Sequence, residues 1–225
     1  MNKFAISSKD IGSALMRSAS SLSSANNTLD ESIALITAAN SSVQDADVTG
    51  TAMKTIAMRV RNTSGQLQEM GEDADGAAES LTKLQQQLLG LTNNKVNIFE
   101  ADNTTFKSTY QIISDISKVW GGLTDKSQAD ITRLLAGARQ GNVFNSLITN
   151  FKTAEDVLAQ SLDSVGSATA ENEKFLQSID GKIEKLKANF QELSSVFVDS
   201  GLIKGIIDIG SSGLSGLTTF IDKFG

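Results

Sequence analysis

Residues 137–142, "GARQGN", hold the arrangement in this sequence that comes nearest to a ligand-binding motif. Arg139 stands between Gly137 and Gly141, and a guanidinium in a glycine-rich loop can bind an anion. The same residues also suit a corner between two helices, because Gly137 can end one helix and Gly141 or Asn142 can cap the next. We expect the corner, with Arg139 directed at helix-end carbonyls or at a carboxylate.

The residue types needed for most catalytic sites are missing. The chain has no His and no Cys, which excludes Ser-His-Asp and Cys-His sites and thiolate metal ligands. Carboxylate-pair and Ser-Lys chemistry stay formally open, but Glu69, Glu72, Asp73 and Asp75 are typical of a solvated connector. The glycine-rich "GSSGLSG" at residues 210–216 lacks the Lys and Ser/Thr of a Walker A loop. We therefore expect no enzyme activity, no metal site and no cofactor.

The charge balance argues against a dedicated nucleic-acid binder. The 225 residues carry a net charge of −6, and specific DNA-binding domains usually present a basic face. The basic run "RVR" at Arg59 to Arg61 is better explained by cations near a helix C-terminus. No run of 18 apolar residues occurs, so no segment is expected to span a bilayer by itself.

The elements that would position these residues are predicted to be helices. The chain has no proline, and apolar residues recur at helical spacing over most of its length. Thr28 followed by Glu31 has the pattern of a capping box. Val96 to Phe99 is the strand candidate, so we expect an all-α fold with at most one minor β element. We also expect an elongated assembly of several helices.

The segment from Thr169 to Val198 has the most regular pattern, because its large apolar residues alternate at intervals of three and four. This 3.5-residue repeat predicts a coiled-coil-like long helix, although packing within an intramolecular hairpin would use the same pattern. The predicted helix-helix interface consists of Leu176, Ile179, Ile183, Leu186, Phe190, Leu193 and Phe197.

We divide the chain into four regions. Residues 1–93 form an N-terminal helical region, 94–166 a central helical block after a short extended piece, 167–200 the long heptad helix, and 201–225 a glycine-interrupted apolar helical segment. Glycines in the last region favour close helix contacts, and membrane contact by this segment is the alternative.

Three blocks resemble the core region of phage tail tape measure proteins of the type found in long-tailed phages of Gram-positive bacteria. They are "DIGSALMRSASSLSSANNTLDESIALITAANSSVQD" with "VTGTAMKTIAMRVR", then "TFKSTYQIISDISKVWGGLTDKSQADITRLLAGARQGNVFNSLITNF", then "GSATAENEKFLQSIDGKIEKLKANFQEL". The resemblance covers about residues 5–208 and depends on the order of the blocks. The family often has a proline after the "QD" turn, where this chain has Ala46 and Asp47.

The resemblance implies a structural virion protein that lies in the lumen of the tail tube and sets tail length. The implied partners are the tail tube protein, tail assembly chaperones, tail-tip proteins and further copies of the chain, with assembly in the host cytoplasm and a possible part in DNA ejection. Fully helical, 225 residues would extend roughly 340 Å at most, so we expect a piece of a longer protein or a remnant gene. The alternative is a membrane-active helical protein, such as a pore-former or secreted effector.

Overall fold

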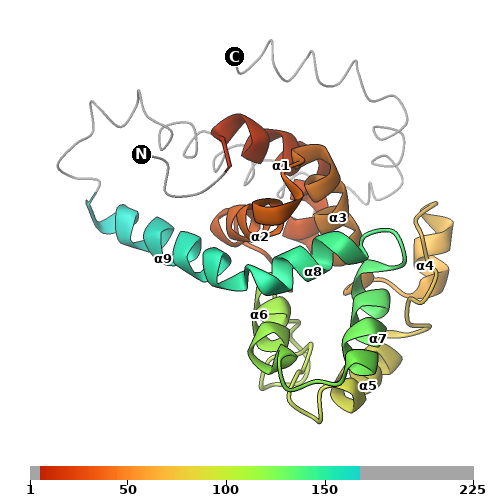
Figure 1. Cartoon of the computed structure of the whole chain (residues 1–225). Coiled ribbons are helices and arrows are strands. Elements are labelled where there is room, and N and C mark those ends of the chain that lie inside the picture. Colours follow the sequence, from red (N-terminus) through yellow and green to blue (C-terminus); the bar gives the residue numbers. More distant parts are fainter. Residues whose placement is uncertain (1–5, 168–225) are drawn as a thin grey trace.

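The computed structural model describes residues 6–167, and 69% of this part is helical, with no strand. The predicted all-α fold is therefore confirmed. The helices are α1 (Ser8–Ser24), α2 (Leu29–Val43), α3 (Ala46–Arg59), α4 (Ser64–Glu69), α5 (Leu81–Leu91), α6 (Thr109–Trp120), α7 (Asp125–Ala136), α8 (Gly141–Thr149) and α9 (Phe151–Ser167) (Figure 1). The heptad interface residues from Leu176 to Phe197 lie outside the described residues, so that prediction is untested.

Side-chain caps explain where most of these helices begin. The predicted capping box is present: the Thr28 hydroxyl accepts from the Glu31 amide at 3.1 Å, and the Glu31 carboxylate accepts from the Thr28 amide at 2.9 Å. Such a box satisfies two amides that have no partner inside the helix. The same arrangement begins three further helices, through Ser7 with Asp10, Thr63 with Gln66, and Ser108 with Gln111.

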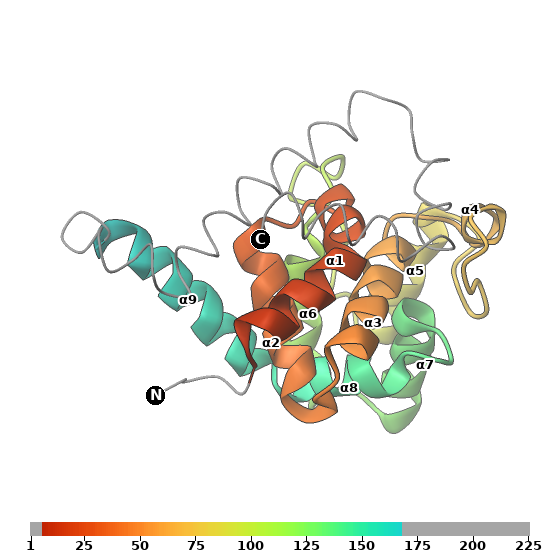
Figure 2. The same cartoon turned by 90° about the horizontal axis from the view of Figure 1, so that it is seen from above.

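Helices α1 and α3 lie parallel and very close together, with α2 running back between their ends (Figure 2). A Cβ added to Gly50 of α3 would lie 2.6 Å from the carbonyl oxygen of Ala14 in α1, well inside van der Waals contact. Only a residue without a side chain allows the two backbones to approach this closely. Gly50 therefore sets the distance between these helices.

Helix α2 is the centre of the hydrophobic core. It is buried on most of its sides, and Leu35, Ile36, Ala38 and Ala39 are fully buried. It packs against α1 and α3 on one side and against α8 and α9 on the other. Helices α8 and α9 cross the molecule between α1–α3 and the group α5–α7 (Figure 1). The core includes residues from both sides of the predicted boundary at 93/94.

Aromatic contacts fix the second half of the chain to this core. The ring of Tyr110 in α6 lies 5.3 Å from that of Phe151 at the start of α9, and the rings of Trp120 and Phe144 are 5.9 Å apart in an edge-to-face arrangement. Such geometries are favoured by the aromatic quadrupole. They hold α6 against the α8–α9 junction.

The strand candidate at Val96 to Phe99 forms an isolated antiparallel bridge between Phe99 and Phe106, which agrees with the expectation of at most one minor β element. The apolar residues from Val143 to Ala154 share one buried face, but the helix itself is interrupted at Asn150, between α8 and α9. The Asn150 side-chain amide donates to the Ser146 carbonyl at 2.8 Å. Gly166 lies within α9 and does not break this helix. The elongated, coiled-coil character is not confirmed.

Candidate functional site

The chain turns sharply between α7 and α8, at the predicted helix corner. Helix α7 ends at Ala136, and Gly137 follows with φ 67°, in the region that favours glycine. Helix α8 begins at Gly141, but its N-cap position is Gln140, which makes no capping hydrogen bond with its side chain. The cap expected at Gly141 or Asn142 therefore lies one residue earlier and is not a side-chain cap.

Arg139 does not have the role that its position suggested. Its side chain is exposed, and it forms no hydrogen bond or ion pair with any described residue. The expectation that it meets helix-end carbonyls or a carboxylate is therefore wrong within residues 6–167.

The cation that meets the end of α7 is Arg59, the last residue of α3. Its side chain is only 2% exposed. Its Nε donates to the Leu134 carbonyl at 3.0 Å, and its Nη2 donates to the Arg133 carbonyl at 2.9 Å. Both carbonyls lie in the last turn of α7, where the helix dipole favours a positive charge. The Arg133 carbonyl also accepts from the Gly137 amide at 3.0 Å, so it is shared between that amide and Arg59. Arg59 thus caps a helix other than its own.

The remaining donors of Arg59 reach a loop that follows α4. Its Nη1 donates to the Asp73 carbonyl at 2.7 Å and its Nη2 to the Asp75 carbonyl at 2.7 Å. Burial lowers the pKa of Arg59, while the nearby carboxylates of Asp73 and Asp75 oppose that shift. The guanidinium is therefore compensated by four carbonyl dipoles and by two nearby carboxylates that form no ion pair with it.

Gly137 packs directly against the buried guanidinium of Arg59. A Cβ built on it would lie 3.2 Å from Arg59 Nη1 and 3.4 Å from an Asp73 carboxylate oxygen. Its positive φ and its missing side chain are both needed, because a side chain would crowd the guanidinium. The corner and the buried arginine therefore form one structural unit.

Arg61 joins the two halves of the described chain in a similar way. Its Nη2 donates to the Ala25 carbonyl at the end of α1 (3.0 Å) and to the Lys107 carbonyl before α6 (2.5 Å). Its guanidinium carbon lies 4.5 Å from the centroid of the Phe106 ring, within cation–π distance. Burial lowers the pKa of Arg61 to about 10, so the side chain stays charged at neutral pH.

The sequence contained a signal for Arg59 that its basic neighbour obscured. The "RVR" run was correctly placed at the end of a helix, but both guanidinium groups bind the ends of other helices. Arg59 follows Ala52 and Ile56 at intervals of four and three, which puts it on the buried face of α3. An arginine on an apolar helix face must find several acceptors, because burying an unpaired charge is very costly.

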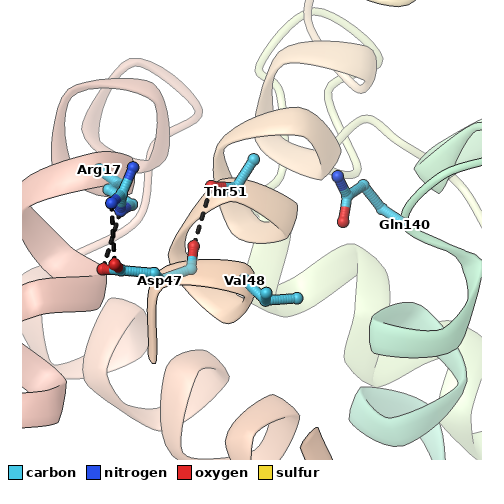
Figure 3. Close-up of a pocket in the computed structure, with 5 residues that line it drawn as sticks. All are labelled: Arg17, Asp47, Val48, Thr51 and Gln140. Atoms are coloured by element: carbon cyan, nitrogen blue, oxygen red, sulfur yellow. Dashed lines mark hydrogen bonds and ion pairs between the residues drawn. The ribbon is translucent and has the colours of Figure 1, made fainter. Parts of the chain in front are cut away.

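An open hollow of about 220 Å³ lies on the surface between α3 and the corner (Figure 3). Its lining residues are Arg17, Asp47, Val48, Thr51 and Gln140. Arg17 and Asp47 pair through two contacts of 2.9 Å, and the Arg17 hydrogen bond holds the pKa of Asp47 below its usual value. Because the two charged groups satisfy each other and are largely exposed, the hollow presents no activated acid, base or nucleophile.

A second open hollow, of about 440 Å³, lies between α5 and α7. The cation that lines it, Arg133, is paired with Asp75.

Within residues 6–167, no group of three acidic side chains is placed to hold a metal ion, and no helix is long and apolar enough to cross a bilayer. No family model matches the chain, and no solved structure matches it.

Proposed function

We propose that the chain is a structural phage tail protein, a piece of a tape measure protein that acts in tail assembly and tail-length determination. The observation that carries this proposal is the resemblance of three long sequence blocks that occur in the family's order. A single short motif arises easily by chance, whereas several long blocks in one order are harder to explain otherwise.

The contacts between the first two blocks support a packing role for the residues that carry the resemblance. The Tyr110 amide at the start of α6 donates to the Asn27 side chain at 2.9 Å, and the Asn26 side chain donates to the Phe106 carbonyl at 2.9 Å. Arg61 adds its bonds to Ala25 and Lys107 at the same junction. The polar residues of the two blocks are thus used to join helix ends, which suits a protein whose function is assembly.

Localisation in purified particles tests this proposal. Tailed particles from the host that carries the gene are separated on a density gradient and probed with an antibody against residues 6–167. The chain should cosediment with tails, should resist protease while the tube is intact, and should become sensitive once the tube is opened. A chain that sediments away from tails contradicts the proposal, and recovery in the membrane fraction would favour the membrane-active alternative.

A further inference from the structure

Three stretches that lie far apart in the sequence meet at the C-terminal end of α7. They are the end of α3 at Arg59, the acidic stretch at 69–76 and the corner at 137–141. We propose that residues 64–78, called the acidic latch from here on, open and close as a unit together with this corner, while the core around α2 stays folded.

The latch is closed mainly by polar contacts. Arg59 donates to the carbonyls of Asp73 and Asp75. On the outside, Arg133 of α7 pairs with both carboxylate oxygens of Asp75, at 3.1 and 2.9 Å, and Lys54 of α3 pairs with Glu72 at 2.6 Å. The Arg133–Asp75 pair is exposed, and exposed pairs contribute little, whereas the Lys54–Glu72 pair is part-buried. Of the three cations that hold the latch, Arg59 is the buried one.

The latch contains two buried apolar side chains, Leu67 and Ala78, and of these only the small Ala78 belongs to the main hydrophobic cluster. Helix α4 makes no extensive contact with any other helix, and it stands at the edge of the molecule in both views (Figures 1 and 2). Leu67 is its one buried side chain, and it lies outside the main hydrophobic cluster. Segments with little apolar burial are those that open below the free energy of global unfolding.

Arg59 couples this opening to the corner. Its other two hydrogen bonds end on carbonyls of α7, and Gly137 fits against its Nη1 atom. When the latch leaves, the guanidinium loses two acceptors and meets water, and water also reaches the carbonyls that it caps. The hydrogen bonds between Arg59 and the last turn of α7 are then no longer shielded from water, so the corner opens in the same step.

Residue-resolved hydrogen exchange of the full chain, followed by NMR, tests this coupling. The latch reporters are the amides of Glu72 and Ala77, which donate to Leu67 and Ala74, and the corner reporter is the amide of Gly137, which donates to Arg133. These three amides should share one protection factor, at least tenfold below that of Ile36 in α2. In Asp75→Asn, which removes the carboxylate but keeps the carbonyl, all three should exchange faster by one common factor, with Ile36 unchanged.

Asp47→Asn is the matched control, because it weakens an equally exposed two-contact pair with Arg17 on another surface. It should leave all three reporters unchanged. Arg59→Lys, if it folds, should accelerate the three amides further than Asp75→Asn does. The proposal is overturned if Asp75→Asn accelerates Glu72 and Ala77 but not Gly137, or if Ile36 accelerates equally.

Discussion

The buried arginines Arg59 and Arg61 share one feature: each donates to backbone carbonyls of segments other than its own helix. A lysine could not replace either of them, because a single ammonium cannot reach acceptors arranged around a planar fork. Each charge-assisted hydrogen bond contributes about 1.5–3 kcal/mol. The polar bonds of these two residues therefore specify how the segments after α1, α4 and α7 are arranged.

The first prediction concerns Gly137→Ala. The alanine would have to adopt φ 67° with its methyl group 3.2 Å from Arg59 Nη1, so we expect a loss of about 1–3 kcal/mol in the free energy of unfolding. Gly141→Ala is the control at the other end of the corner. Gly141 lies within α8, and its methyl group would meet only the Thr132 side chain at 3.1 Å.

Urea unfolding followed by far-UV circular dichroism measures both variants. Gly137→Ala should have the lower midpoint, and Gly141→Ala should stay within about 1 kcal/mol of the parent. A Gly137→Ala protein as stable as the parent would show that the positive φ and the contact with Arg59 are not required.

At the scale of elements, α1 and α3 contain two glycines for which the same substitution should have opposite effects. Gly50→Ala places a methyl group 2.6 Å from the Ala14 carbonyl oxygen, so the two helices must separate, at a cost of about 1–3 kcal/mol. Gly12→Ala adds a methyl group in open space within α1 and should stabilise by about 0.5–1 kcal/mol. Thermal unfolding should move the two melting temperatures to opposite sides of the parent; a shift in the same direction would contradict the packing described for α1 and α3.

Local sequence signals predicted the individual helices well. Most of the differences between the sequence-based predictions and the structure come from contacts between residues far apart in the sequence. Thr28 with Glu31 and the start of α7 at Thr124 to Asp125 could be predicted because the capping atoms lie within the same four residues. The break at Asn150 could not be predicted, because the helical spacing of apolar residues continues through it into α9. The acceptors of Arg59 lie 14 to 75 residues away, so its role required the fold.

The association prediction for the heptad segment rests on sequence alone. Burying each large apolar residue of the interface from Leu176 to Phe197 should contribute roughly 1.5–3 kcal/mol, so seven of them are not expected to stay solvated. Ile183→Asp combined with Leu186→Asp places two charges in this interface. Analytical ultracentrifugation should find the parent chain as an oligomer and the double variant as a monomer. A parent chain that remains monomeric at high concentration would mean that the apolar residues are covered within one chain.

At the scale of the whole molecule, the packing of the helices in residues 6–167 affects how a protein of this kind could determine tail length. Several segments share one hydrophobic core, so this part is far shorter when packed than the same residues in one continuous helix. If the chain belongs to a length-determining protein, its contribution to tail length depends on whether these helices stay packed. Added residues should lengthen the tail by at most about 1.5 Å each, and by less if they pack.

The proposed role in tail-length determination is tested most directly by tail length itself. The codons for residues 94–166 are duplicated in frame within the gene in its phage, and the same codons supplied as a separate gene serve as the control. Tail lengths are then measured by negative-stain electron microscopy. We expect the in-frame duplication to lengthen the tails and the separate copy to leave them unchanged. Assembled tails that contain the enlarged chain but keep the parental length would contradict a length-determining role.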